Sequence, residues 1–84
     1  MTVSMESVLI ALSRLPSSDN LKLRRLASEA NVSMMSCRRA VRRLSNEGYI
    51  TAFRAASRGN LTYSFSLTGK GQDVAVALKY QQGL

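Results

Sequence analysis

Four arginines stand in two adjacent pairs, Arg38-Arg39 and Arg42-Arg43, within the segment SMMSCRRAVRRLSNEGYI of residues 33–50. Apolar residues recur between the pairs at helical spacing, so the segment predicts an amphipathic helix with cations on one side. A guanidinium group is always charged and forms paired hydrogen bonds with phosphates and with base edges. The pattern therefore favours binding of a polyanion. A charged face that only keeps the helix soluble is the alternative for the same residues.

The charge is concentrated in the middle of the chain. The 84 residues carry a net charge of +7, from 12 Lys and Arg against 5 Asp and Glu. Nine of the cations lie in residues 20–60, where the only acids are Glu29 and Glu47, and the charges of the two flanks cancel. A basic middle in a neutral frame is typical of proteins that bind nucleic acid or another anionic surface.

Several kinds of chemistry are excluded by composition. The chain has no histidine, few acids and one cysteine, Cys37. Histidine-ligated metals, histidine general bases, carboxylate dyads and an internal disulfide are therefore ruled out. No apolar run approaches the roughly 18 residues of a membrane helix, and the N-terminus lacks the basic start of a signal peptide. We expect a soluble cytoplasmic protein that is not an enzyme and has no cofactor, metal, membrane partner or evident small-molecule ligand.

Helical periodicity predicts four helices, at residues 4–15, 23–30, 34–46 and from a Thr68 cap to about residue 81. Pro16 ends the first, and residues 17–20 and 31–33 are turns, with residues 21–23 extended between them. Ser33 caps the third helix and Gly48 ends it. On the last helix one face is formed by Val74, Ala77, Leu78 and Gln81.

A helical wheel divides the third helix into two faces. One stripe consists of Cys37, Ala40, Val41 and Leu44, and we expect it to be buried, with the Cys37 thiol acting as a small apolar group. The opposite face carries Met35, Arg39, Arg42, Arg43 and Asn46, with Arg38 at its border. The arginines should therefore point away from the core.

After Gly48 the pattern changes to a period of two, which predicts strands at residues 50–56 and 61–67. The tip between them is Ser57-Arg58-Gly59-Asn60, in which Gly59 and Asn60 tolerate positive φ. In the second strand, apolar residues alternate with Ser and Thr, so Tyr63 and Phe65 are expected to pack on the helices. An RNA-stacking platform would instead need these rings exposed beside basic residues.

The segment LRRLASEANVSMMSCRRAVRRLSNEGYI of residues 23–50, followed by the hairpin and LTGKG at residues 67–71, resembles the winged helix-turn-helix domains of bacterial regulators such as the MarR and GntR families. The resemblance covers nearly the whole chain, although the sequence has no separate effector domain. It implies an α+β fold with three helices, a β-hairpin wing and a C-terminal helix, in one domain over residues 1–84. It also implies double-stranded DNA as the partner, with the recognition helix in the major groove.

The resemblance assigns a role to each candidate residue of the helix at residues 34–46. Base edges would be met by Met35, Ser36 and Arg39, and phosphates by Arg38, Arg42 and Arg43. Ser33 and Ser36 suit a phosphate oxygen at the helix N-terminus. On the hairpin, Arg58 would follow the phosphates or enter the minor groove, with Arg54 behind it; the alternative for Arg58 is a charge that guards an edge strand. For Lys22, Arg24 and Arg25, phosphate contact and plain solvation are equally open.

Taken together, these residues predict a sequence-specific, nucleoid-associated DNA-binding protein that regulates transcription, as a repressor. We expect a homodimer on two half-sites, with its interface on the first and last helices. Two alternatives remain open at this point. One is an architectural or accessory DNA factor of a mobile element, and the other is a winged helix that docks an acidic protein partner.

Overall fold

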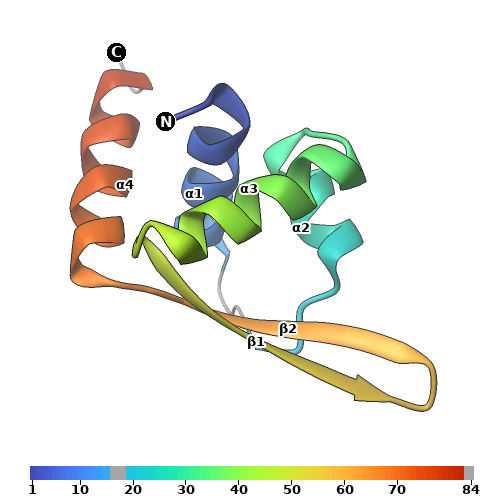
Figure 1. Cartoon of the computed structure of the whole chain (residues 1–84). Helices are drawn as coiled ribbons and strands as arrows, with labels where there is room; N and C mark the ends of the chain where they lie inside the picture. Colours follow the sequence, from blue (N-terminus) through green and yellow to red (C-terminus); the bar gives the residue numbers. More distant parts are fainter. Residues whose placement is uncertain (16–18, 83–84) are drawn as a thin grey trace.

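The computed structural model describes residues 1–15 and 19–82, with Ser57 and Gln82 described in the backbone only. Its elements, shown in Figure 1, are α1 (Val3–Arg14), α2 (Leu23–Ala30), α3 (Met34–Asn46), β1 (Ile50–Ser57), β2 (Asn60–Leu67) and α4 (Gly69–Gln82). The predicted α+β order of helices and strands is confirmed, with ends displaced by no more than a residue. The predicted stop at Pro16 and the serines after it lie outside the described residues.

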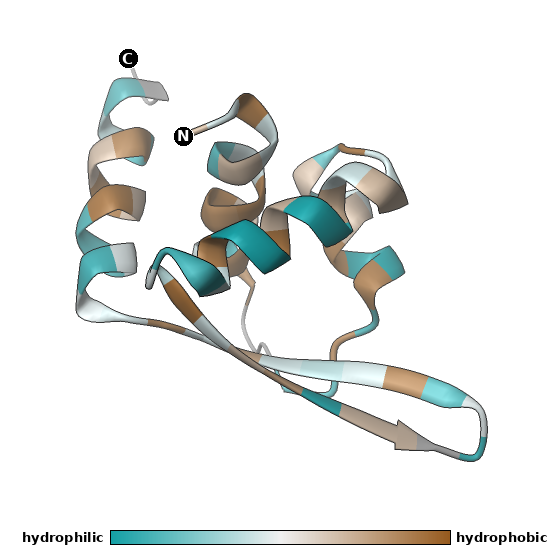
Figure 2. Ribbon diagram, viewed as in Figure 1, coloured by the Kyte–Doolittle hydropathy of each residue, from teal (hydrophilic) through white to brown (hydrophobic). Residues whose placement is uncertain are grey.

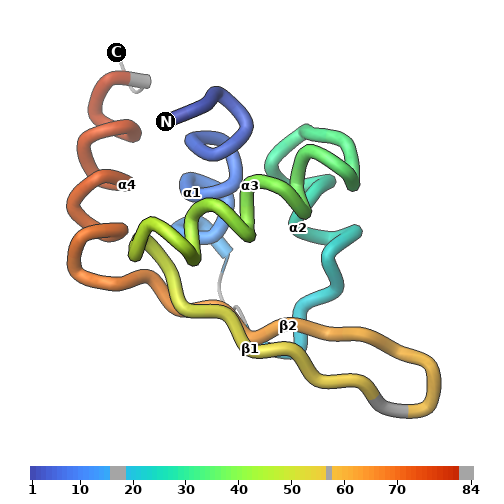
Figure 3. Tube along the Cα trace, in the orientation of Figure 1, coloured from blue at the N-terminus to red at the C-terminus, as the bar shows by residue number. Residues whose placement is uncertain are grey.

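Helix α1 is the centre of the helical layer. The Thr2 hydroxyl caps it by accepting a hydrogen bond from the Met5 N–H at 3.1 Å. Met5, Val8, Leu9 and Leu12 are buried, and α1 packs against α2, α3 and α4. In the Cα trace of Figure 3, α4 and α2 lie on either side of α1 and α3 crosses in front of it. Burial on three sides explains why the apolar residues of α1 recur all around the helix.

The turn between α2 and α3 is fixed by its backbone. Asn31 adopts the left-handed conformation, with φ of +57°. Its N–H donates to the carbonyl of Ser28 at 3.1 Å, and the N–H of Val32 donates to the carbonyl of Ala27 at 3.0 Å. These are the two hydrogen bonds of a Schellman motif, which ends a helix and turns the chain sharply. Val32 then packs on the core, so α3 starts at a defined angle to α2.

The hairpin formed by β1 and β2 pairs in one antiparallel register, from Ile50 opposite Leu67 to Ser57 opposite Asn60. The two residues at its tip have positive φ, Arg58 at +51° and Gly59 at +81°. The prediction of positive φ is right for Gly59 and wrong for Asn60. Asn60 is already paired with Ser57 in the hairpin, so the two turn residues are Arg58 and Gly59. A two-residue turn of this kind requires positive φ at both positions.

One further backbone pairing ties the hairpin to the helices. Leu21 and Tyr63 exchange two hydrogen bonds of 2.7 and 2.8 Å, so the segment before α2 lies along β2. The rings of Tyr63 and Phe65 are buried and stacked, with centroids 5.5 Å apart. Their predicted packing on the helices is confirmed, and burial removes them from any role as a nucleic-acid stacking platform.

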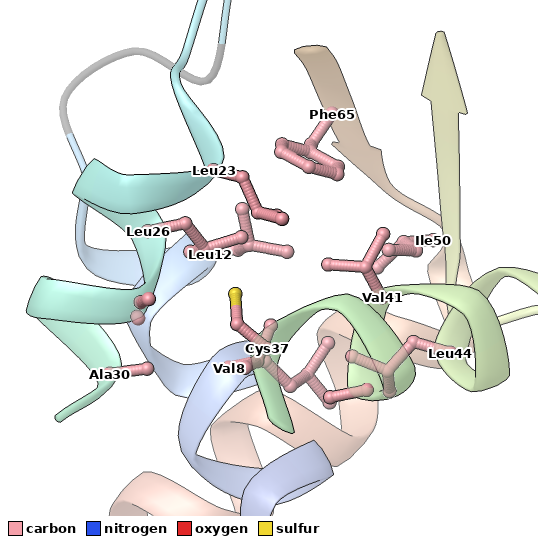
Figure 4. Close-up of a cluster of buried hydrophobic side chains, with 14 of the residues drawn as sticks. Val8, Leu12, Leu23, Leu26, Ala30, Cys37, Val41, Leu44, Ile50 and Phe65 are labelled. Carbon is pink, nitrogen blue, oxygen red and sulfur yellow. The ribbon is translucent and has the colours of Figure 1, made fainter. Parts of the chain in front are cut away.

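Figure 4 shows the core beneath α3, where Cys37, Val41 and Leu44 face side chains of α1, α2 and the strands. The stripe predicted from the helical wheel is confirmed, since its four residues are all buried. Burial of this stripe requires the opposite face of α3 to be turned to solvent.

The packed face of α4 differs from the predicted one. Thr68 caps the helix as expected, accepting the N–H of Gly71 at 3.0 Å. Ala75 is buried beside half-buried Val74 and Leu78, whereas Ala77 and Gln81 are exposed. Because Gly71 has no side chain, α4 approaches the carbonyl of Tyr49 closely at that point. This contact turns the helix so that the face bearing Gly71 and Ala75 lies inward.

Candidate nucleic-acid interface

The outward face of α3 carries the arginines that the helical wheel predicted for it. Arg38, Arg39, Arg42 and Arg43 are all exposed, and Met35 between them is 65% exposed. Figure 2 shows several strongly hydrophilic segments along the ribbon of α3. No segment of the described chain covers them, so the face is open to a ligand.

Few acids neutralise this face. Within the described part of the chain, Glu47 lies 3.5 Å from Arg43 and Glu29 lies 3.1 Å from Arg25, and neither pair is buried. Such exposed pairs contribute little, typically below about 1 kcal/mol. Arg38, Arg39 and Arg42 have no ion-pair partner among the described residues. Their charge is therefore available to an external anion.

A groove of about 510 Å³ separates α3 from the hairpin. Arg38 and Arg42 line it from α3, and Arg54 lines it from β1. In the strand register Arg54 of β1 lies directly opposite Tyr63 of β2, so the two side chains are on the same face of the hairpin. Tyr63 is buried, and this face is therefore the one that packs on the helices. The hairpin therefore places Arg54 opposite the α3 arginines, where a single anionic ligand could meet cations from both elements.

A smaller groove of about 220 Å³ continues the first toward the hairpin tip. The two share four lining residues, namely Leu23, Arg38, Leu61 and Tyr63. Lys22 and Arg24 add cations at this end, where Gly59 and Asn60 also line the groove. We call the two together the hairpin groove. The sequence left Lys22 and Arg24 undecided, and only the Leu21–Tyr63 pairing brings them beside the hairpin.

A separate groove of about 230 Å³ lies on the other flank of α3, against the start of α1, and we call it the α1 groove. Arg39 and Arg43 line it from α3, together with Ser36. The hydroxyl residues Thr2 and Ser4 line it from the α1 side. The sequence did not predict Thr2 and Ser4 as site residues, because no local pattern indicates that the start of the chain lies beside α3.

The two serines at the start of α3 have different roles from one another. The Ser33 hydroxyl accepts the N–H of Ser36 at 3.1 Å and donates to the Ser36 hydroxyl at 3.0 Å. Ser33 is therefore the N-cap predicted from the sequence, and its hydroxyl proton is engaged within the protein. The Ser36 hydroxyl receives that bond and keeps its own proton free for a ligand.

Arg58 occupies a conformation that arginine rarely adopts. It is exposed at the hairpin tip with φ of +51°, where a residue with a Cβ costs about 1–2 kcal/mol relative to the ordinary region. Asn or Gly is the usual residue at this position of a two-residue turn. Residues held at such a cost cluster at functional sites, so Arg58 is a candidate site residue on conformational grounds as well as on charge.

The Cys, Asp and Glu side chains of the described residues do not gather into a metal site. In residues 1–15 and 19–82, no three His, Cys, Asp or Glu side chains gather closely enough to hold a metal ion. Burial raises the pKa of the Cys37 thiol from 9.0 to about 11, so it is a protonated core residue and a poor nucleophile at neutral pH. No described helix has the length and apolar character to cross a membrane.

The fold is shared with solved structures of regulators. The chain superposes on the adhesin competence repressor AdcR of Streptococcus pyogenes with a TM-score of 0.77 and 22% identity, covering 99% of this chain and 58% of that one. The MarR family transcription regulator SP03579 gives a TM-score of 0.74 and 18% identity, with 99% and 52% covered. The chain has a winged helix-turn-helix fold. Its α2 and α3 are the helix-turn-helix, and its hairpin is the wing.

A third winged-helix neighbour, F-93 of SSV1, is closer in length. It gives a TM-score of 0.61 and 22% identity, covering 94% of this chain and 86% of that one. The chain spans only about half the length of the MarR-family structures that it matches. No protein-family model and no curated protein sequence matches the chain.

Proposed function

We propose that this winged helix binds double-stranded DNA in a sequence-specific way and regulates transcription. The observation that carries the proposal is the division of α3 into a buried stripe and an open, almost unneutralised row of arginines. The neighbours described as a repressor and as a transcription regulator support the same function for this fold.

The dimensions of α3 suit a major groove. An α-helix with its side chains is about 10–12 Å wide, and the major groove of B-DNA is about 12 Å wide. The 13 residues of α3 are about 20 Å long. Its N-terminal half would enter first, as is usual for the second helix of a helix-turn-helix. Met35, at the crest of the exposed face, would then contact the methyl group of a thymine.

The hairpin would hold the backbone beside the recognition helix. Arg58 extends from the tip toward the phosphates or the minor groove, where a narrow groove attracts arginine. Arg54 would act nearer to α3, inside the hairpin groove. Cations on two separate elements would fix both the depth and the rotation of the protein on the duplex.

We propose a homodimer as the binding species and repression as the outcome, through occupation of a promoter. Outward-facing apolar residues on α4 support the dimer, since Val76 and Tyr80 are 64% and 76% exposed one helical turn apart. A second copy would cover them and place two α3 helices on two half-sites about 34 Å apart. Sedimentation with a palindromic duplex should give a mass of two chains per site, and a single chain would contradict the dimer.

The test of DNA binding is selection of bound duplexes from a random pool, followed by titration of the best duplex at several salt concentrations. Affinity should fall with salt, with a log–log slope of about −0.9 for each phosphate neutralised. An Arg39→Ala, Arg42→Ala double variant should lose most of the binding, whereas Arg14→Ala on α1 should lose little. Unchanged binding by the double variant would reject the proposal. Equal affinity for heparin and for every duplex would instead indicate a non-specific architectural factor or a module for acidic proteins.

A further inference from the structure

The four arginines of α3 are shared between two grooves. Arg38 and Arg42 line the hairpin groove, and Arg39 and Arg43 line the α1 groove. We propose that each groove holds the phosphate backbone of a different strand of one duplex. This inference rests on the proposed function and adds a strand assignment to it.

Helical geometry produces the division. Residues four apart on a helix lie almost one above the other, so each pair forms a short row along one flank of α3. The two rows are offset by one residue, or about 100° around the helix axis. A helix lying in a major groove has one phosphate backbone on each side, because both strands border the groove. Two arginine rows on two flanks match two backbones.

The hairpin groove has the stronger positive charge. Its described lining contains five cations and no carboxylate. The cations come from α2 and the residue before it, from α3 and from β1, and are Lys22, Arg24, Arg38, Arg42 and Arg54. Apolar residues such as Val41 and Tyr63 line the groove beside these cations, so an anion in it would be partly enclosed. An anion in this groove is therefore screened less than one on an open surface.

The α1 groove combines two guanidinium groups with hydroxyls. The Thr2 oxygen accepts the Met5 N–H, which leaves its hydroxyl proton free to donate to a phosphate oxygen. Ser36 offers a second free hydroxyl proton, since its oxygen only accepts from Ser33. Arginine side chains and hydroxyls are the usual protein partners of DNA phosphates. This assigns Arg39 to a phosphate and not to the base edge that the family resemblance implied. Met35 then lies between the two flanks.

The test uses duplexes in which methylphosphonates, which carry no charge, replace the phosphates of one strand within a half-site. The wild-type chain should bind either singly neutralised duplex more weakly than the unmodified one. Two double variants, Arg38→Ala, Arg42→Ala and Arg39→Ala, Arg43→Ala, remove the same two charges from the same helix and differ only in flank. They are therefore matched controls for each other, and alanine preserves the helix.

We expect each double variant to bind the unmodified duplex about 10- to 100-fold more weakly, as for the loss of charge-assisted hydrogen bonds. Neutralising one strand should cause a clearly smaller loss in the first variant than in the wild type, because Lys22, Arg24 and Arg54 remain in that groove. Neutralising the opposite strand should cause a clearly smaller loss in the second variant than in the wild type. The corresponding glutamine variants, which keep most of the side chain, should give the same two patterns. Circular dichroism and thermal unfolding confirm that each variant is folded.

Two results would overturn the strand assignment. In one, both double variants lose sensitivity to the same strand relative to the wild type. In the other, each variant remains equally sensitive to both strands. Either result leaves the proposed DNA binding intact, since the wild-type chain still binds. Failure of the wild-type chain to bind any duplex would overturn both the proposed function and this inference.

Discussion

The hydroxyl of Thr68 donates a hydrogen bond of 2.7 Å to the carbonyl oxygen of Gly48, and so joins the start of α4 to the end of α3. Gly48 has φ of +83° and follows the last turn of α3 in a Schellman motif, with Tyr49 N–H bonded to Leu44 at 2.9 Å. Lys70 adds to this contact between α3 and α4. Its ammonium group donates a hydrogen bond of 3.0 Å to the Glu47 carbonyl and lies 4.4 Å from the centre of the Tyr49 ring. These contacts therefore fix the start of α4 against the end of α3.

Replacing Thr68 by Val should weaken the contact between α3 and α4 with little change in side-chain volume. The variant loses both the bond to Gly48 and the N-cap bond from Gly71, so we expect a loss of about 1–2 kcal/mol in the free energy of unfolding. Thr68→Ser keeps the hydroxyl and should lose less than half of that amount. Urea denaturation of the three proteins measures the difference. Equal stability of the Val and Ser variants would show that the hydroxyl has no such role.

A methyl group at Gly71 should be more disruptive than one at Gly69. A Cβ at Gly71 would collide with the backbone carbonyl of Tyr49, which cannot move without shifting the end of α3. We expect Gly71→Ala to destabilise the fold by about 1–3 kcal/mol. Gly69 lies in the same helical turn with open space around its Cα, and Gly69→Ala should stabilise the fold by about 0.4–1 kcal/mol. Thermal unfolding should therefore give shifts of opposite sign, and two shifts of the same sign would contradict the proposed contact.

Local signals predicted the helix-turn-helix from the sequence. The stripe of Cys37, Ala40, Val41 and Leu44 follows from the period of one helix, and the cap at Ser33 depends only on its neighbours. The packed face of α4 could not be predicted in this way. It is set by the contact of Gly71 with Tyr49, 22 positions earlier in the chain, and glycine carries no hydropathy signal for such a contact.

The candidate site was also only partly predictable. The helical wheel showed that the α3 arginines face outward, because direction from the axis is a local property. It could not show which groove each one lines, because the walls come from distant segments: Thr2 and Ser4 on one flank, Arg54 and Tyr63 on the other. At the hairpin tip, the register of Ser57 with Asn60 decided which residues adopt positive φ.

The Cys37 thiol should make stability depend on pH in alkaline solution. Burial raises its pKa from 9.0 to about 11, so the unfolded chain loses this proton at a lower pH than the folded one. The contribution is present in full below pH 9, and it is lost as pH rises from 9 to 11. Between pH 8 and pH 10.5 we expect the wild-type chain to lose about 2 kcal/mol more than Cys37→Ala, whose other titrating groups are the same. Urea denaturation at both pH values measures this, and parallel losses in the two proteins would show that Cys37 does not titrate differently on unfolding.

At the hairpin tip, stability and DNA binding should oppose each other. Arg58 has φ of +51°, and Asn is favoured over Arg in that conformation. Arg58→Asn should therefore raise the free energy of unfolding by about 0.5–1 kcal/mol. The same change removes a cation proposed to meet a phosphate, so the slope of log affinity against log salt should become shallower by about 0.9. Arg58→Lys keeps both the charge and the unfavourable conformation, and it should resemble the wild type in both measurements. If Arg58→Asn were more stable and yet bound DNA with an unchanged slope, the cation at the tip would have no part in binding.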